Sequence, residues 1–336
     1  HPVDRRQRQM CIRDSTLPMT NNPKNADKIG FPILVKAAAG GGGKGMRIVR
    51  KQKELKDAIT SAEREAEGGF GDKRVFLERY IAKSRHIEIQ ILGDSHGNII
   101  HLGERECSIQ RRHQKVVEES PSPIIDYDLR NKMGEAAIKM ASLLKYESAG
   151  TVEFLFDEKT KEFWFLEVNT RLQVEHPVTE EVTGIDLVRE QLKIANGDPL
   201  SISQDDVEII GSSIEVRLYS EDPGNDFLPV TGKLIAFDPC EEPLVRWDVG
   251  VESGSEITPN FDPMLAKIIS YGEDRIEAAN KLALALEKSH FGGLKTNRDY
   301  LIAILRSEEF LKGNTTTDFL NQACLLYTSP SPRDSS

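Results

Sequence analysis

A run of glycine between two short apolar segments constrains the fold of this chain more than any other feature. Residues 40–45 read Gly-Gly-Gly-Gly-Lys-Gly, and they separate the apolar residues 33–35 from the extended pattern of residues 46–49. This order predicts a strand, a glycine loop and a second strand. The loop is not a Walker A motif, because Gly45 rather than Ser or Thr follows Lys44, and a strand rather than a helix comes next.

The glycine loop is suited to binding phosphates. Successive glycines let backbone N–H groups lie close over phosphate oxygens, and Lys44 adds positive charge. A flexible surface hairpin explains the glycines equally well when they are taken alone. Lys36 favours phosphate binding, because it ends the apolar strand at the place where phosphates would lie.

A second pair of predicted strands, 151–157 and 162–169, carries acidic residues. If residues 159–161 form the turn, Glu153 opposes Glu167. Two opposed carboxylates are unfavourable unless a cation lies between them, and such oxygen ligands suit Mg²⁺ or Mn²⁺ bound together with substrate phosphates. A solvated outer face is the alternative, although aromatic residues crowd both strands.

The following segment offers polar side chains at alternate positions. Arg171, Gln173 and Glu175 come directly after the strand that ends at Asn169. Arginine can bind a small planar oxyanion through two parallel hydrogen bonds, and a nearby glutamate can accept a proton. A polar loop that caps a sheet is an equally good interpretation of this segment by itself.

Net charge and cysteine content narrow the class of protein. The formal net charge is −10, which argues against nucleic acid as a partner, although residues 111–115 form a local basic cluster. No apolar run approaches the ~20 residues that a membrane span needs, so we expect no membrane partner. The four cysteines show no C-x-x-C spacing, which fits a reducing compartment.

Taken together, these motifs resemble a known family. Lys36, the glycine loop, the segment 78–81 and the set Glu153, Glu167 and Asn169 are similar to the ATP-grasp fold. Three strings narrow the resemblance to biotin carboxylases: RHIEIQ at 85–90, ERECSIQRRHQKVVEESP at 104–121 and EVNTRLQVEHPVTE at 167–180. The resemblance runs from about residue 28 to about residue 320. It implies an α+β protein, with an ATP-grasp fold followed by a biotin carboxylase C-terminal mixed α+β domain.

The resemblance and the local patterns divide the chain into expected parts. Residues 21–85 are expected to form the small lid subdomain of the ATP-grasp fold, 86–208 its large subdomain, and 209–323 the C-terminal domain. Residues 1–20 and 324–336 lack any helical or strand period and are expected to be non-native or disordered tails. Helical spacing predicts helices at 53–67, 128–146, 186–196, about 274–288 and about 297–311. Strands are predicted at 74–78, 86–92, 98–102 and 213–222.

The family resemblance implies roles for individual residues. The implied ATP-binding residues are Lys36, Gly41, Gly42, Gly43, Lys44, Glu78, Ile81, His86, Gln110 and His113. The implied bicarbonate site is Lys115, Arg171, Gln173 and Val174, and the implied metal ligands are Glu153, Glu167 and Asn169. Glu175 would deprotonate bicarbonate, and Arg217 would stabilise the biotin enolate, with Asp262 beside it. The catalytic set is therefore Glu175, Arg171, Lys115 and Arg217.

The implied reaction is ATP-dependent carboxylation of biotin with bicarbonate through carboxyphosphate. Its cofactors would be ATP, two Mg²⁺ or Mn²⁺ ions, and biotin carried on a separate domain or chain, because no Met-Lys-Met tripeptide is present. Expected partners are a biotin carboxyl carrier domain, a carboxyltransferase subunit and further copies of the chain. The segments 225–234 and 292–305 resemble acyl-CoA carboxylases of the propionyl and methylcrotonyl type. Such enzymes are cytoplasmic in bacteria and lie in the mitochondrial matrix in eukaryotes.

Two alternatives remain open at the sequence level. Biotin carboxylases normally begin with a further nucleotide-fold subdomain, and this chain starts after it, so a catalytically silent nucleotide-binding fragment is one alternative. Another ATP-grasp ligase, such as a carbamoyl-phosphate synthetase, is the second. Those ligases share the lysine, the glycine loop and the metal carboxylates, but not the strings HQKVVEE and QVEHPV.

Overall fold

The computed structural model describes residues 17–39, 46–112 and 114–320, which form two compact units. The small unit contains His1–Ser84, Arg111–Gln114 and Leu155–Leu166. The large unit contains Arg85–Gln110, Lys115–Phe154 and Glu167–Ser336. The domain boundaries given above stay predictions.

The small unit contains a four-stranded antiparallel sheet with a helix packed against it. Its strand order is β1 (Met19–Thr20), β4 (Val75–Arg79), β2 (Ile33–Ala37) and β3 (Arg47–Val49), and the helix is α3 (Leu55–Phe70). Strands β2 and β3 pair in antiparallel fashion, which confirms the predicted strands on either side of the glycine loop. The loop itself lies outside the described residues. Helix α3 runs through Gly68 and Gly69, so the predicted stop there is wrong; Gly71, at φ +68°, ends the helix instead.

An eight-stranded sheet is the main feature of the rest of the chain. Its order is β15 (Arg246–Val249), β17 (Met264–Gly272), β10 (Ser212–Tyr219), β7 (Gln114–Ser120), β6 (Ile99–Arg111), β5 (Ser84–Gly93), β8 (Ser148–Asp157) and β9 (Glu162–Asn169). The prediction of a short strand at 98–102 is wrong in extent, because β6 and β7 form a long hairpin. Arg111 and Arg112 of the basic cluster lie at the turn of this hairpin, and Lys115 lies within β7.

Three helices of the large unit begin where an aspartate side chain accepts a backbone N–H group. These are α4 (Tyr127–Leu144), α6 (Leu187–Ala195) and α7 (Arg275–Lys288), capped by Asp126, Asp186 and Asp274. The predicted single helix at 297–311 is wrong: α8 (Arg298–Arg306) and α9 (Glu308–Leu311) are separate. Ser307 is extended between them, and its side chain accepts the N–H of Phe310 to start α9.

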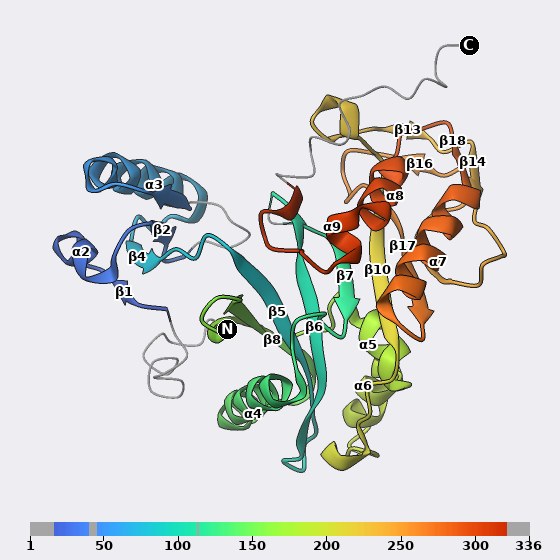
Figure 1. The fold of residues 1–336 in the computed structure, drawn as a ribbon, viewed down its shortest axis with the longest axis horizontal. Helices are drawn as coiled ribbons and strands as arrows, with labels where there is room; N and C mark the ends of the chain where they lie inside the picture. The colour runs from blue at the N-terminus through green and yellow to red at the C-terminus, as the bar shows by residue number, and fades with distance from the viewer. Residues whose placement is uncertain (1–16, 40–45, 113, 321–336) are drawn as a thin grey trace. The chain divides into compact units, whose positions relative to one another are not determined.

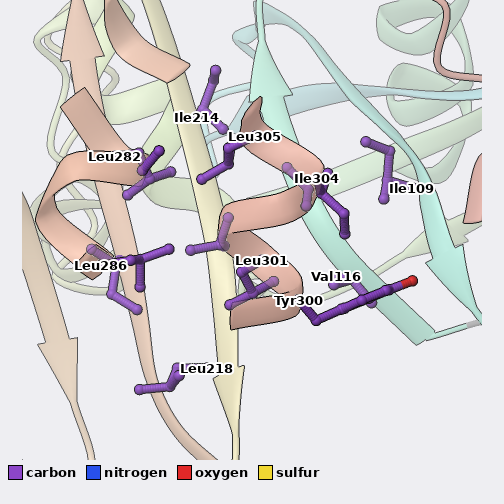
Figure 2. Packing of buried hydrophobic residues seen from close by; sticks show 14 of the residues in the cluster. Ile109, Val116, Ile214, Leu218, Leu282, Leu286, Tyr300, Leu301, Ile304 and Leu305 are labelled. Carbon is purple, nitrogen blue, oxygen red and sulfur yellow. The ribbon is translucent and has the colours of Figure 1, made fainter. Parts of the chain in front are cut away.

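The apolar face of β10 forms part of the core of the large unit. Ile214, Val216 and Leu218 are fully buried among leucines of α7 and α8. Figure 2 shows Leu282, Leu286, Leu301 and Leu305 converging on this strand, and Figure 1 shows α7 and α8 beside β10 and β17. Because side chains alternate along a strand, Glu215 and Arg217 lie on the opposite face of β10.

The remaining elements are short. They are α2 (Ala26–Ile29), α5 (His176–Thr183), β11 (Glu221–Asp222) with β12 (Leu228–Pro229), β13 (Gly232–Lys233) with β16 (Glu256–Ile257), and β14 (Ala236–Asp238) with β18 (His290–Gly292). Short 3₁₀ turns lie at Pro23–Asn25, Gln52–Glu54, Gln204–Asp206 and Pro223–Asn225. Among the described residues, no helix has both the length and the apolar character required to cross a bilayer.

Candidate active site

Charged side chains from four strands and one helix start converge in the large unit. The contributing residues are His86 and Glu88 on β5, Lys115 and Glu118 on β7, Glu153 on β8, Arg217 on β10 and Glu175 at the start of α5. Each strand residue points away from apolar neighbours at adjacent positions, since successive side chains lie on opposite faces. Charged groups are rarely buried unless they are paired, so this cluster is the candidate active site.

Lys115 is the central cation of the cluster. Its Nζ lies 2.6 Å from Oε2 of Glu88, 3.2 Å from Oε1 of Glu153 and 2.5 Å from Oε1 of Glu175. Burial acts to lower the pKa of Lys115, but Cys107 and the surrounding carboxylates outweigh it, and the pKa is raised well above its ordinary value. The lysine therefore stays positively charged and holds three carboxylates together.

Glu153 is the most heavily bonded carboxylate of the cluster. Besides Lys115, its Oε1 accepts from Nδ2 of Asn169 at 2.9 Å and from Nε2 of Gln173 at 3.1 Å. Burial acts to raise its pKa, but the contacts with His86 and Lys115 reverse this and hold the pKa of Glu153 below its ordinary value. The carboxylate is consequently ionised at neutral pH.

The orientation of His86 follows from its two ring contacts. Nε2 of Gln110 lies 2.7 Å from Nδ1 of His86, and also 2.7 Å from the carbonyl oxygen of Cys107. Nε2 of His86 lies 2.9 Å from Oε2 of Glu153. Burial acts to lower the pKa of His86, but the Glu153 carboxylate outweighs burial and the pKa is raised above its ordinary value. The structure thus brings together His86 and Gln110, both predicted to line the nucleotide pocket.

Carboxylates that fit a divalent ion lie at this site. Ligand atoms of His86, Glu88 and Glu153 all lie within 4.8 Å of one another. Two carboxylates in such a set suit Mg²⁺ or Mn²⁺, which prefer oxygen ligands. Glu167 does not join this set and is exposed.

The connection between β8 and β9 is longer than assumed, and the opposition of Glu153 and Glu167 stays a prediction. Strand β8 ends at Asp157 and β9 begins at Glu162, so residues 158–161 form the connection, one residue more than assumed. Asn169, two residues after Glu167 on β9, donates to Glu153, so the alternation of side chains places Glu167 on the same face of the sheet as Glu153.

Arg217 joins two carboxylates at the edge of the cluster. Its Nε donates to Oε1 of Glu118 at 2.7 Å, and its Nη2 donates to Oε2 of Glu175 at 3.0 Å. The side chain is mostly buried, and its charge is balanced by these two acids. Arg217 and Lys115 therefore contact opposite oxygens of the same carboxylate, that of Glu175.

Other predicted site residues lie outside the direct contacts of this cluster. Arg171 is exposed, and its Nη1 donates to the carbonyl of Leu172. Asp262 is also exposed, and its side chain accepts the N–H of Met264. The carbonyl oxygen of Val174 accepts from Nζ of Lys267 at 2.6 Å.

Three of the residues predicted to bind ATP, Lys36, Glu78 and Ile81, lie in the small unit. Nζ of Lys36 lies 3.0 Å from Oε2 of Glu78, so the two residues are paired. Ile81 is half-buried just after β4. The predicted residues Gly41, Gly42, Gly43, Lys44 and His113 lie outside the described residues.

A surface hollow of about 600 Å³ in the small unit involves none of these residues. It is lined by Arg47, Asp57, Thr60, Ser61, Arg64 and Glu65.

Sequence reasoning missed several charged residues of the cluster. Arg105 is fully buried, and its guanidinium donates to Glu88, Gln90, Thr151 and Thr179. Glu88, Glu118 and Lys267 were also not identified. A signal was present, because polar residues alternate with apolar ones within HIEIQ at 86–90, and KVVEE at 115–119 places charged residues on both sides of two valines.

Comparisons with known proteins identify the family of this chain. Residues 10–203 match the family model of the carbamoyl-phosphate synthase L chain ATP-binding domain. Residues 215–322 match the biotin carboxylase C-terminal domain. The second match favours biotin carboxylases over carbamoyl-phosphate synthetases, as the sequence strings predicted.

Individual relatives of the chain are also biotin carboxylases or subunits of biotin-dependent carboxylases. The chain is 48% identical to biotin carboxylase 2 of Bacillus subtilis, over 89% of this chain and 67% of that protein. It is 46% identical to the mitochondrial methylcrotonoyl-CoA carboxylase subunit alpha of Rattus norvegicus, over 89% of this chain and 42% of the relative. It is 50% identical to the mitochondrial propionyl-CoA carboxylase alpha chain of Homo sapiens, over 88% of this chain and 41% of the relative. The chain thus spans less than half the length of these two subunits.

Solved structures show the same fold. The biotin carboxylase domain dimer of Hydrogenobacter thermophilus 2-oxoglutarate carboxylase, in complex with MgADP, ADP and bicarbonate, gives a TM-score of 0.89 at 40% identity, covering 94% of this chain and 72% of that one. Biotin carboxylase from Campylobacter jejuni, in a β,γ-ATP complex, gives 0.89 at 41% identity, with the same coverage of 94% and 72%. The fold and the site define an ATP-grasp protein, homologous to ligases. More narrowly, the chain belongs to the biotin carboxylase family.

Proposed function

We propose that this chain carboxylates biotin with bicarbonate at the expense of ATP, as the first half-reaction of an acyl-CoA carboxylase. The observation that carries the proposal is the position of Glu175. Its carboxylate lies between Lys115 and Arg217, one cation suited to an oxyanion and one suited to a developing enolate.

Bicarbonate activation is the first step in this proposal. Lys115, Arg171, Gln173 and the backbone of Val174 would bind bicarbonate, and Glu175 would accept its proton. The freed oxygen would attack the γ-phosphorus of ATP, giving carboxyphosphate and ADP. Catalysis of such a step is mostly positioning and charge neutralisation, which a cluster of fixed cations provides.

Nucleotide and metal binding form the next part of this proposal. Lys36, the glycine loop and His113 would contact phosphates, Glu78 and the backbone near Ile81 would bind the adenine, and His86 and Gln110 would line the pocket. Glu153, with Glu167 and Asn169, would hold two Mg²⁺ or Mn²⁺ ions, which when bound would neutralise phosphate charge.

Transfer to biotin is the second step. Carboxyphosphate would release CO₂ and phosphate, and the phosphate would remove the N1 proton of biotin. Arg217 would stabilise the resulting enolate, with Asp262 nearby, and N1 would then attack CO₂ to give carboxybiotin. A labile intermediate of this kind needs protection from water.

Partners and compartment follow by analogy with the relatives. A biotin carboxyl carrier domain would present the biotin, and a carboxyltransferase subunit would consume the carboxybiotin. The Hydrogenobacter thermophilus domain is described as a dimer, which supports a homo-oligomer. The relatives from rat and human are mitochondrial, which supports the matrix if the source is eukaryotic and the cytoplasm if it is bacterial.

Bicarbonate-dependent ADP release from Mg·ATP, with and without free biotin, tests the proposal. We expect a biotin-stimulated rate that Lys115→Ala abolishes and that the exposed control Lys139→Ala leaves unchanged. A chain that binds ATP but releases no ADP above background would contradict the proposal and support the silent nucleotide-binding fragment.

A further inference from the structure

Two glutamates face each other across the strands β7 and β10. Glu118 and Glu215 are directly opposed in the antiparallel register, and both are 0% exposed. Side chains in such a position are close neighbours. The two acids lie on the face of the sheet that also carries Arg217 of β10.

Three of their four carboxylate oxygens have no hydrogen-bond partner. These are Oε2 of Glu118 and both oxygens of Glu215, within the part of the chain that the structure describes. The fourth, Oε1 of Glu118, accepts from Nε of Arg217 at 2.7 Å. A buried carboxylate without a partner is costly, and two that face each other repel. A proton held between the two acids removes both costs.

We propose that Glu118 and Glu215 share a single proton, and that this pair positions Arg217 for biotin. The inference rests on the proposed function for its consequence in catalysis, but not for the shared proton itself. Glu215, protonated, donates its O–H to the free oxygen of Glu118. Glu118 keeps one negative charge, which it directs at Arg217.

The other charged groups around the pair act in both directions. Lys115, Lys267 and Arg217 lower the pKa of one or both acids, and Glu175 raises it. Lys115 on β7, Lys267 on β17, Arg217 on β10, Glu175 at the start of α5 and the thiol of Cys107 on β6 all act on the two acids.

Burial is the main cause that raises the pKa of Glu118, to about 7, against the attraction of Arg217. Burial and then the charge of Glu118 raise the pKa of Glu215 well above its ordinary value. One of the two acids therefore retains its proton near neutral pH.

The shared proton controls how strongly Arg217 is held. With one proton in the pair, Arg217 faces one charge from Glu118 and one from Glu175, and its remaining donors stay available for a ligand. Loss of the proton adds a second buried negative charge beside the guanidinium. We then expect Arg217 to be drawn toward the pair, and biotin-dependent turnover to fall as the pH rises.

The shared proton can be measured without turnover. Infrared spectra of the full chain should contain a band of a protonated carboxylic acid that Glu215→Gln removes and that the exposed control Glu135→Gln retains.

The pH dependence of stability is a second test, because the folded protein binds this proton more tightly than the unfolded chain. Its contribution to stability is therefore present at low pH and declines as the pH rises above about 4.5, the ordinary value for glutamate. The wild type should thus lose stability as the pH increases, while Glu215→Gln does not lose this contribution. The unfolding free energy of Glu215→Gln should therefore rise relative to that of the wild type.

Turnover tests the effect on Arg217. Glu118→Gln should lower the biotin-stimulated rate relative to the biotin-independent rate by roughly tenfold to a hundredfold, the range for a lost charge-assisted hydrogen bond. Glu215→Gln should move the alkaline limb of the biotin-dependent pH profile to higher pH.

If Glu215→Gln neither removes an acid band nor alters the pH dependence of stability, the shared proton is excluded. If those two results hold but the alkaline limb does not move, the link to Arg217 is excluded. Absence of any turnover in the wild type would count against the proposed function and the positioning role, while the infrared and stability results still decide the shared proton.

Discussion

Glu175 and Arg217 are in contact although 42 residues separate them in the chain, with Oε2 of Glu175 3.0 Å from Nη2 of Arg217. The proposed base for bicarbonate thus touches the proposed cation for biotin. Lys115 contacts the other oxygen of the same carboxylate. A change in the charge of Glu175 is therefore felt directly by both cations.

Replacement of Glu175 by glutamine tests its role as the base. We expect Glu175→Gln to lower bicarbonate-dependent ADP release by about 10²- to 10⁴-fold, because glutamine cannot accept the proton. Initial rates at saturating Mg·ATP measure this, with Glu135→Gln on the surface of α4 as the control. ATP affinity should stay the same, and a rate near the wild type would assign the proton to another group.

Replacement of Arg217 by lysine tests the need for a guanidinium. Arg217 reaches Glu118 and Glu175 with separate nitrogens, and a single ammonium group cannot reproduce that geometry. We expect Arg217→Lys to reduce the biotin-stimulated rate about tenfold to a hundredfold, with a smaller loss in the rate without biotin. Equal losses in both rates would indicate a general structural effect instead.

Lys267 is predicted to position the bicarbonate loop through the backbone of Val174. Its Nζ lies 2.6 Å from the Val174 carbonyl oxygen and 3.3 Å from Oδ2 of Asp248. Lys267→Met should raise the KM for bicarbonate about tenfold, through loss of a hydrogen bond from a charged donor, with little change in the KM for ATP. Lys267→Arg should restore part of the loss. Parallel changes in both KM values would contradict a local role.

Asp94 is predicted to stabilise the turn between β5 and β6 in a pH-dependent manner. Its carboxylate accepts the N–H groups of His96, Asn98 and Leu200. Burial acts to raise its pKa, but these hydrogen bonds and the one from the Asn98 side chain lower it from 3.8 to about 2. The stabilisation is therefore complete above pH ~4 and is lost as the pH falls toward 2.

Asp94→Asn should reduce the free energy of unfolding by about 1–3 kcal/mol at pH 7, the range for hydrogen bonds to a charged group. Urea unfolding at several pH values measures this, with Asp238→Asn, at the exposed last residue of β14, as the control. The difference from the wild type should shrink below pH ~4. A difference that is constant with pH would mean that the carboxylate charge is not involved.

Local pattern predicted a large part of the fold. The glycine loop predicted β2 and β3, and helical spacing predicted α3, α4, α6 and α7. These signals could be found because each lies in one continuous stretch of the chain. The strings that identify the family also contain most residues of the cluster. Helix α5 was missed because it is short, and its polar residues read equally well as a loop.

Only the tertiary structure decided which charges meet. The opposition of Glu118 and Glu215 depends on the register of β7 against β10, strands nearly a hundred residues apart in the chain. Register is set by the packing of apolar faces such as that of β10 against α7 and α8, and not by the residues on the polar face. The sequence by itself determined the family and the chemical groups available. The packing of the sheet determined which carboxylate each cation contacts.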